Sequence, residues 1–467
     1  MHEDPRADVI IGFSFQVEKA GTRKGPAFHI FFAFCQVICY ASQPMKILVI
    51  GGGGREHTLA WKLAQDEQVS RIFWSPGNAA ARLPQKVEIC NVRADDVHAL
   101  ADLAVKEKVD LTVVGPEAPL VAGVADEFHQ RGLRIFGPTR QGAQLEGSKV
   151  FSKQFFLKHG VPTGRAGIFS DMDEALAFAR KQPKPLVVKA DGLAAGKGVI
   201  ICANDAEAEK ALREIMEQKV FGEAGQQVLV EECLSGPEVS VHAITDGTHY
   251  KVLASAQDHK RALDGDRGPN TGGMGTYSPA PIFTPELESR VRKEVFDRTL
   301  EGLKADGIPY CGVLYAGLML TKDGPKILEY NCRFGDPETQ VIFTRLENNL
   351  ASVLSAACDG KLGSVDLRWK SDAAVCVVIA AGGYPGNYRK GDVIDGLDDA
   401  SRCDGTQVFH AGTTLKDGRI ITTGGRVLGV TALGKNHRQA VDHAYGAVKK
   451  IRFEGMQYRR DIAAKAL

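Results

Sequence analysis

From Met45 onward, short apolar runs alternate with segments in which apolar positions recur at helical spacing, the first of these segments being Glu56–Gln65. This alternation is typical of parallel sheets, because parallel strands need helical crossovers between them. It predicts an N-terminal α/β domain over residues 45–145. Its strands are expected at Lys46–Ile50, Arg71–Trp74, Leu111–Val114 and Arg134–Phe136.

The middle of the chain, residues 146–367, is predicted to form a second domain with a flap subdomain over about 164–235. Helices are expected over Phe151–His159, Asp205–Gln218 and near Asn348–Cys358. Strand composition marks Leu186–Val188, Val199–Ile201, Val228–Val230, Val313–Leu320 and Lys326–Tyr330. The polar, glycine-rich segment Asp258–Pro281 is expected to be a long loop, which in a compact domain is usually functional or disordered.

Beyond residue 367 the expected strands become short, which predicts a small β-rich C-terminal domain over residues 368–467. They are Ala373–Ala381, Gln407–Phe409, Arg419–Thr422 and Val427–Val430, followed by a helix over His437–Lys450. Asp417-Gly418 is a strong hairpin-turn signal.

Residues 1–44 do not follow these patterns. Phe28–Ala41 is apolar but short for a bilayer span, and Glu3, Asp4 and Asp8 argue against a signal or transit peptide. We expect a dispensable extension, with a secretory signal as the alternative.

Composition narrows the function classes. The 467 residues are 44% hydrophobic and 25% charged with a net charge of +1, which offers no basic surplus for nucleic acid. The ten cysteines show no CxxC pair and no Cys/His ligand spacing. Reduced thiols and a cytoplasmic protein are therefore expected. Neither a nucleic-acid partner nor a membrane partner is expected.

Two of the expected strands flank a glycine-dense loop, Asp191–Gly198. Glycines let backbone N–H groups approach phosphate oxygens, and Lys189 and Lys197 add positive charge. The loop is not a Walker A motif, because Gly198 replaces the Ser or Thr and a strand follows instead of a helix. A flap that closes over a nucleotide is favoured, and an ordinary hairpin turn is the alternative.

A second glycine cluster, Gly51–Gly54, follows the first strand. A dinucleotide fingerprint needs a small residue where Glu56 stands and an acidic residue after the next strand, near Trp74, where none occurs. A dinucleotide is therefore not expected. Binding of a single phosphate and a merely tight turn fit the local sequence equally well.

Polar residues interrupt the apolar strand that begins at Ile327. Glu329 and Asn331 share one face because side chains alternate along a strand, and paired oxygen ligands suit Mg²⁺. Arg333 and Asp336 follow in the loop, where a guanidinium can grip a small carboxylate with two hydrogen bonds. An exposed strand face with a salt-bridged loop is the alternative.

The remaining candidate site residues give weaker sequence signals than these motifs when each is taken alone. The strand end Glu231-Glu232 can offer backbone groups to an adenine edge, and Glu238 can accept hydrogen bonds from ribose hydroxyls. At Lys149, a solvated helix lysine is the simpler interpretation. His259 has no nucleophile-type residue near it in sequence, which favours an orienting role over a catalytic base.

Taken together, these motifs resemble the ATP-grasp ligases, and specifically the phosphoribosylamine–glycine ligase family. The resemblance runs from Met45 to near the C-terminus, with order and spacing preserved. It rests on GREH after the first strand, VGPEAPLVAG at 114–123, GPT and LEGSK within 137–149, VKADGLAAGKGV, QDHKRALDGDRGPNTGGMGTYSPAP at 257–281 and EYNCRFGDPETQ at 329–340.

The resemblance implies an α/β fold with a Rossmann-like N-terminal domain, a central ATP-grasp domain and a small β-rich C-terminal domain. It implies that glycine attacks the γ-phosphate of MgATP to give glycyl phosphate and ADP. The amine of 5-phosphoribosylamine would then displace phosphate and form glycinamide ribonucleotide in purine biosynthesis. Mn²⁺ is an alternative metal, and a cytoplasmic monomer or dimer is expected.

The resemblance also implies site residues. For ATP these are Lys149, Lys189, Gly196, Lys197, Gly198, Glu231, Glu232, Leu234 and Glu238, and for the metal Glu329 and Asn331. For the other substrates they are Gly52, Gly53, Gly54, Arg55, Glu56, Asp258, Lys260, Asn270, Thr271, Gly272, Gly273, Arg333, Gly335, Asp336 and Pro337. Arg333, Asp336 and Lys189 are the candidate catalytic residues.

Three other functions are considered. An ATP-grasp carboxylase, or another carboxylate–amine ligase, would share the fold and differ in its substrate, so bicarbonate-dependent activity would indicate it. Glu56 argues against an NAD-dependent oxidoreductase. The competent residue types throughout the motifs argue against an inactive nucleotide-binding regulator.

Overall fold

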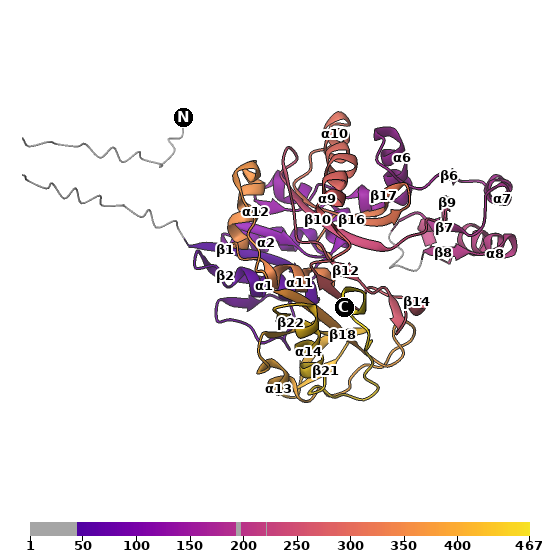
Figure 1. Cartoon of the computed structure of the whole chain (residues 1–467). Helices are drawn as coiled ribbons and strands as arrows, with labels where there is room; N and C mark the ends of the chain where they lie inside the picture. Colours follow the sequence, from indigo (N-terminus) through magenta and orange to yellow (C-terminus); the bar gives the residue numbers. More distant parts are fainter. Residues whose placement is uncertain (1–43, 193–197, 221) are drawn as a thin grey trace, which may run out of the picture. The chain divides into compact units, whose positions relative to one another are not determined.

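The computed structural model describes residues 44–192, 198–220 and 222–467. The predictions made for the N-terminal extension, and those for Gly196 and Lys197, lie outside the described residues. The described chain is α/β, with four sheets of four or five strands each, and the predicted fold class is confirmed (Figure 1). No helix in this part of the chain is long and apolar enough to cross a membrane.

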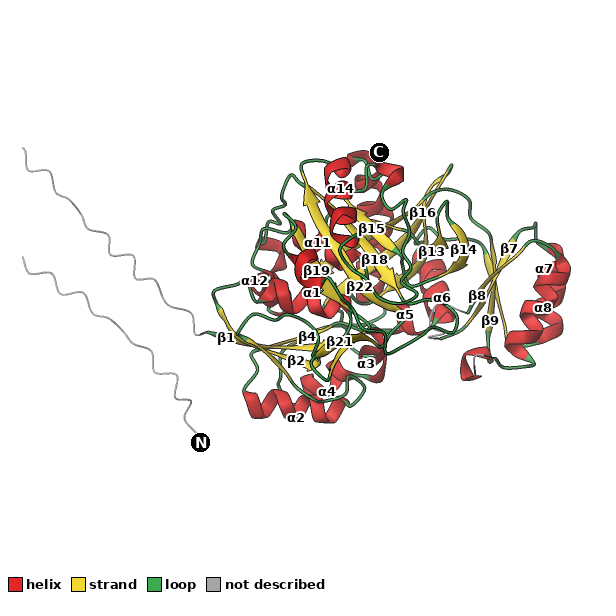
Figure 2. Ribbon diagram, turned by 90° about the horizontal axis from the view of Figure 1, so that it is seen from below, coloured by secondary structure: helices red, strands yellow, loops and turns green. Residues whose placement is uncertain are grey.

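The first sheet is wholly parallel, in the order β3-β2-β1-β4-β5. Its strands are β1 (Met45–Gly51), β2 (Val69–Pro76), β3 (Val87–Ile89), β4 (Leu111–Val114) and β5 (Ile135–Phe136). Helices α2 (Val97–Glu107) and α4 (Val124–Gln130) cover one face, and α1 (Gly54–Leu63), α11 (Glu338–Arg345) and α12 (Leu350–Cys358) lie on the other (Figure 2). Burial on both faces explains the uninterrupted apolar runs from which these strands were predicted.

The central sheet is antiparallel, in the order β11-β10-β16-β17. Its strands are β10 (Glu238–Thr245), β11 (Tyr250–Val252), β16 (Gly312–Thr321) and β17 (Gly324–Asn331). Nearby helices are α3 (Glu117–Ala122), α5 (Gln144–Gly147), α6 (Lys149–His159), α9 (Pro285–Val291), the π-helix Arg292–Asp297 and α10 (Arg298–Ala305). Glu329 pairs with Gly317 and Ile327 with Leu318, so Leu328 is an extra residue that bulges from β17.

The predicted flap forms a small sheet of its own, in the order β6-β9-β7-β8. It comprises β6 (Ala166–Phe169), β7 (Leu186–Ala190), β8 (Val199–Cys202) and β9 (Val228–Glu232), with α7 (Met172–Lys181), α8 (Asp205–Met216) and a 3-10 turn at Gly222–Gly225. The two strands that flank the glycine loop pair antiparallel, from Lys189↔Val199 to Leu186↔Cys202. The helices pack on one face around a separate apolar core (Figure 1, right).

The fourth sheet has the order β12-β15-β18-β22-β19 and joins two distant parts of the chain. Its strands are β12 (Gln257–Asp258), β15 (Gly275–Ser278), β18 (Ala373–Ala380), β19 (Thr406–His410) and β22 (Arg426–Gly434). Helices α13 (Leu397–Ser401) and α14 (His437–Val448), the hairpin β20 (Thr413–Lys416)–β21 (Arg419–Thr422), and 3-10 turns at Leu362–Ser364 and Ala464–Ala466 complete this region.

The prediction that Asp258–Pro281 is a loop was wrong. The segment contains β12, β15 and a hairpin of β13 (Arg261–Leu263) and β14 (Arg267–Asn270). Strands of two to four residues carry no readable alternation, and glycine makes the pairing sterically feasible. Gly275 has φ +151°, and a Cβ there would lie 2.6 Å from the carbonyl oxygen of Cys376 on the neighbouring strand.

The turn predicted at Asp417-Gly418 joins β20 to β21, with φ +50° and +73°. A Cβ at Gly418 would meet no atom within 4 Å, so Gly418→Ala tests backbone conformation alone. We expect about 1 kcal/mol of destabilisation in urea unfolding, the cost of left-handed backbone for a non-glycine residue. Gly446→Ala in α14, which is equally free of contacts, is the matched control and should stabilise by about 0.5–1 kcal/mol. Equal effects of the two changes would contradict this.

Candidate active site

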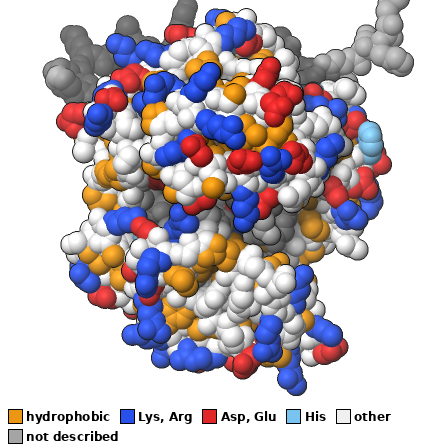
Figure 3. All heavy atoms as spheres, turned by 90° about the vertical axis from the view of Figure 1, so that its right-hand side faces the viewer, with side chains coloured by type: hydrophobic (Ala, Val, Ile, Leu, Met, Phe, Trp, Pro, Cys, Tyr) orange, Lys and Arg blue, Asp and Glu red, His pale blue; other side chains and the backbone are white. Residues whose placement is uncertain are grey.

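A cleft of about 860 Å³ lies between the flap, the central sheet and the β13–β14 hairpin. The space-filling view shows the molecule hollowed between two parts, with Lys and Arg side chains along the margins (Figure 3). The predicted residues that line the cleft are Arg55, Lys149, Lys189, Gly198, Glu231, Glu232, Leu234, Glu238, Asp258, Lys260, Asn270, Thr271, Gly272, Glu329, Asn331, Arg333 and Asp336. Segments more than 250 residues apart in the sequence therefore meet here.

The other described candidates lie behind this lining: Gly52, Gly53, Gly54, Glu56, Gly273, Gly335 and Pro337. Built Cβ atoms at Gly53 and Gly54 would each lie 3.7 Å from the Asp336 carboxylate. A Cβ at Gly273 would lie 2.5 Å from Pro337 and 2.7 Å from Asp258. These glycines let three loops meet at one point.

Glu231 on β9 joins two lysines. Its carboxylate lies 2.6 Å from Lys189 Nζ and 2.7 Å from Lys153 Nζ. Burial would raise the pKa of Glu231, but the two ammonium groups outweigh it and the pKa is lowered. Lys189 Nζ also donates to the carbonyl of Leu328, the bulged residue, at 3.3 Å. The pair therefore connects the flap to the central sheet.

Lys153 was not predicted as a site residue, although it lines the cleft with only 3% of its side chain exposed. Its spacing was a usable signal, because Lys149 and Lys153 are four residues apart and share one face of α6.

Lys149 is a partly buried residue of the cleft lining and not a solvated helix lysine. Ser148 caps α6 and donates to the Asp191 carboxylate at 2.9 Å, while Lys149 Nζ donates to the carbonyl of Gly192 at 2.8 Å. Burial is the main reason that the pKa of Lys149 is lowered. These hydrogen bonds thus connect the start of α6 to Asp191 and Gly192, with which the glycine loop begins.

Glu329 and Asn331 both face the cleft from β17, as the alternation predicts. Burial would raise the pKa of Glu329, but Lys260, Lys189, Lys149 and Arg333 outweigh it, so the pKa is lowered. The amide oxygen of Asn331 accepts a hydrogen bond from Arg333 Nη2 at 3.0 Å. The site thus presents an ionised carboxylate and an amide oxygen on one strand face.

Arg333 is held by two acids of the earlier motifs, Glu117 at 3.1 Å and Glu146 at 2.9 Å. Burial would lower the pKa of Arg333, but these carboxylates outweigh it and raise the pKa. Arg333 therefore lines the cleft, as expected of a guanidinium that binds a small carboxylate. It is also salt-bridged, as in the alternative interpretation of this loop.

Asp336 is similarly paired, with Arg426 Nη2 at 3.2 Å and Gln340 Nε2 at 2.8 Å. Arg426 begins β22, far along the chain, and no local sequence signal marks it. The C-terminal region thus contributes a cation to the loop that the motif EYNCRFGDPETQ forms.

Among the residues predicted for ATP, Glu238 lies 2.9 Å from Lys260 Nζ. Glu232 pairs with Arg165 at 3.0 Å and Lys326 at 3.3 Å. His259 is buried outside the cleft lining, with Nδ1 3.1 Å from the carbonyl of Gly275. Burial lowers the pKa of His259 to about 4, and this environment suits an orienting residue.

The glutamate of the GREH motif, Glu56, accepts hydrogen bonds from residues of its own turn. Gly53 N and Arg55 Nε each donate to the Glu56 carboxylate at 2.6 Å, which caps α1. Arg55 also donates to the carbonyl of Phe334 at 3.0 Å, so this turn is connected to the Arg333–Asp336 loop.

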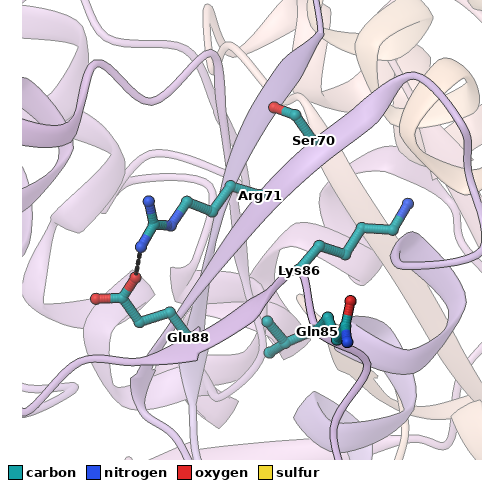
Figure 4. A pocket seen from close by; sticks show the side chains of 6 residues that line it. Ser70, Arg71, Gln85, Lys86 and Glu88 are labelled. Atoms are coloured by element: carbon teal, nitrogen blue, oxygen red, sulfur yellow. Dashed lines mark hydrogen bonds and ion pairs between the residues drawn. The ribbon is translucent and has the colours of Figure 1, made fainter.

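A second pocket, of about 450 Å³, lies at the edge of β2 and β3. Figure 4 shows that Arg71 and Glu88 point toward each other there, while Ser70, Gln85 and Lys86 lie on the other side. None of the predicted site residues lines this pocket. Its exposed ion pair provides a control for substitutions in the cleft.

The fold and the cleft define the class. A four-stranded flap that carries the Lys189–Glu231 pair, with Lys153 of α6 beside it, faces an antiparallel sheet that carries a carboxylate–amide pair, which is the arrangement of an ATP-grasp enzyme.

Comparison with known proteins narrows the class. Models of the phosphoribosylglycinamide synthetase N domain, ATP-grasp (A) domain and C domain match residues 45–146, 147–339 and 374–465. The phosphoribosylamine–glycine ligases of Vibrio vulnificus and Pseudomonas aeruginosa are each 52% identical over 424 residues, covering 91% of this chain and 99% and 98% of theirs.

Two solved structures are also similar. The phosphoribosylamine–glycine ligase of Thermotoga maritima matches with a TM-score of 0.78 and 35% identity, over 89% of this chain and all of that one. A biotin carboxylase domain from Hydrogenobacter thermophilus matches at 0.68 and 17% identity, over 88% and 91%, which shows a shared fold alone. The chain belongs to the phosphoribosylamine–glycine ligase family.

Glu231→Gln should destabilise the protein by about 3 kcal/mol, because it leaves Lys153 and Lys189 buried without a carboxylate. The pKa of Glu231 is lowered in the folded state, so its contribution is present above the ordinary value of 4.5 and is lost as pH falls through the folded pKa. The difference from wild type, measured by urea unfolding, should shrink below pH 4.5. Glu88→Gln in the exposed pair should cost less than about 1 kcal/mol. A difference that does not depend on pH would contradict the assignment.

Proposed function

We propose that this chain is an ATP-dependent ligase that joins glycine to 5-phosphoribosylamine in purine biosynthesis, through glycyl phosphate. The observation that carries the proposal is the match to phosphoribosylamine–glycine ligases over 91% of the chain, with the family motifs converging on one cleft. In the first step a glycine carboxylate oxygen attacks the γ-phosphorus and ADP leaves. In the second, the sugar amine attacks the acyl carbon, loses a proton and displaces phosphate.

The residues suit the nucleotide's charges. Lys149 and Lys189 would hold the α- and β-phosphates, and Glu231, Glu232, Leu234 and Glu238 would surround the adenosine. Phosphoryl transfer needs alignment and charge neutralisation more than covalent help, so the buried Lys189 and the partly buried Lys149 are appropriate. Pairing with Glu231 orients Lys189 before ATP arrives, and the carbonyl of Gly192 holds Lys149.

Glu329 and Asn331 fit a magnesium ion. Their donor set is oxygen only, and Glu329 has no ion-pair partner within the described ranges. Mg²⁺ commonly takes one or two protein ligands and completes its shell with water and phosphate. When bound, it would supply charge neutralisation at the phosphates. Mn²⁺ prefers similar ligands and is the alternative.

The Arg333–Pro337 loop would form the glycine end, with Gly335 and Asp336 near the reacting carboxylate. The glycine turn with Arg55, and the segment carrying Asp258, Lys260 and Asn270–Gly273, would cover the phosphoribosylamine. Closure of the flap would exclude water, which otherwise hydrolyses an acyl phosphate.

We also propose a cytoplasmic enzyme that acts as a monomer or a dimer. Eight cysteines of the described chain are free thiols, which suits a reducing compartment.

Glu329→Gln should lower kcat by about 100-fold or more, because a lost metal ligand removes several kcal/mol of transition-state stabilisation. The measurement is ADP release that depends on both glycine and phosphoribosylamine, the latter generated from ribose 5-phosphate and ammonia. Glu88→Gln should retain wild-type turnover. ADP release with bicarbonate in place of glycine would instead indicate a carboxylase.

The acyl phosphate predicts the fate of one oxygen atom. With glycine labelled by ¹⁸O in its carboxylate, one ¹⁸O should appear in the released phosphate, because that oxygen attacks phosphorus and leaves with it. Mass spectrometry of the phosphate measures this directly. Unlabelled phosphate would rule out the intermediate.

A further inference from the structure

The acids of the cleft divide into those with a cationic partner and those without. Seven acids that line it make ion pairs within 4.0 Å: Glu117, Glu146, Glu231, Glu232, Glu238, Asp266 and Asp336. Three others, Asp258, Glu329 and Glu338, have no such partner among the described residues. Glu329 is the proposed metal ligand, which leaves two acids without an assigned cation.

Glu338 is the more constrained of these two acids. It begins α11 directly after the Arg333–Pro337 loop and is only 2% exposed. Its Oε1 accepts hydrogen bonds from Tyr315 Oη and, at 3.1 Å, from Ser240 Oγ. Across the described chain no group donates to Oε2. The two hydroxyl groups therefore fix the carboxylate and leave one oxygen without a partner.

Gly335 and His242 lie close to that free oxygen. A Cβ built on Gly335 would lie 2.5 Å from Glu338 Oε2 and 2.9 Å from His242 Nε2. Gly335 N donates to His242 Nε2 at 3.2 Å, and the His242 ring stacks on Tyr315 with centroids 4.0 Å apart. Burial lowers the pKa of His242 to about 4, so this imidazole is a neutral acceptor and brings no positive charge.

Asp258, on β12, lines the same cleft, and a Cβ built on Gly273 would lie 2.7 Å from its carboxylate and 2.5 Å from Pro337, the residue before Glu338. Burial and then the Glu338 charge raise the pKa of Asp258 well above its ordinary value. Two neighbouring carboxylates in a buried site resist carrying two negative charges. One small cation placed between the two acids would relieve this repulsion.

The proposed substrates bring such a cation. Glycine carries an α-ammonium group close to the carboxylate that is to be phosphorylated, and an ammonium group buried without an anionic partner is costly. We propose that Glu338, supported by Asp258, binds the α-ammonium group of glycine and makes the site select a charged amine next to the reacting carboxylate. This inference rests on the proposed function and adds a recognition residue to it.

The test compares glycine with glycolate, which has a hydroxyl group in place of the ammonium group. With Glu338→Gln we expect the KM for glycine to rise at least tenfold, while the KM for ATP and the inhibition constant of glycolate change less than twofold. Tyr315→Phe removes a hydrogen bond to the same carboxylate and keeps its charge. It should therefore raise the KM for glycine clearly less than Glu338→Gln does.

Three results would overturn the inference: equal effects of Glu338→Gln on glycine and glycolate, a change in the KM for ATP of the same size, or equal effects of Glu338→Gln and Tyr315→Phe. If Glu338→Gln does not fold, Asp258→Asn replaces it, with an expected rise of at least fivefold for glycine and none for glycolate. Wild-type protein that shows no glycine-dependent ADP release would refute the proposed function as well. If the wild type is active but Glu338→Gln discriminates glycine from glycolate as well as the wild type does, only the ammonium site is refuted.

Discussion

The structure depends on buried charges that neutralise one another across element boundaries. Lys153 and Lys189 share Glu231, Arg333 is held between Glu117 and Glu146, and Arg426 holds Asp336. Each charge would be costly to bury alone, so no member of a pair is stable in the cleft without the element that carries its partner. The same ion pairs therefore hold the elements together and position the charged side chains of the site.

This constraint explains why the cleft is built from so many segments. The proposed ligands, a triphosphate, a metal ion and an amino acid, bring both signs of charge, so they require lysines and carboxylates close together. Backbone features position some of these charges: the carbonyl of the bulged Leu328 accepts a hydrogen bond from Lys189, and Gly335 leaves room for Glu338 and His242. The acids without cationic partners then mark where substrate cations are expected.

Much of the fold was predictable because strong local patterns were present. β4 and β21 have the predicted bounds, and α6, α8, α12 and α14 differ from their predictions by a few residues. The strands of the segment around the β13–β14 hairpin were missed, because they are too short to alternate and because β15 pairs with β18, about a hundred residues away. Predicted site residues from Arg55 to Asp336 converge on one cleft, but Lys153, Arg426 and Glu338 were missed as members of it.

The sequence by itself determined the order of the elements, the glycine-rich turns and the types of residue that handle phosphate and metal. These depend on neighbours along the chain, on side-chain alternation and on motif spacing. Only the tertiary structure decided which charges are paired and which face the cleft alone, because pairing is set by distances between strands and loops from different parts of the chain. Glu338 illustrates the difference: in the sequence it is one more acid after a proline, and in the fold it lines the cleft, where hydroxyl groups from β10 and β16 bond one of its two oxygens.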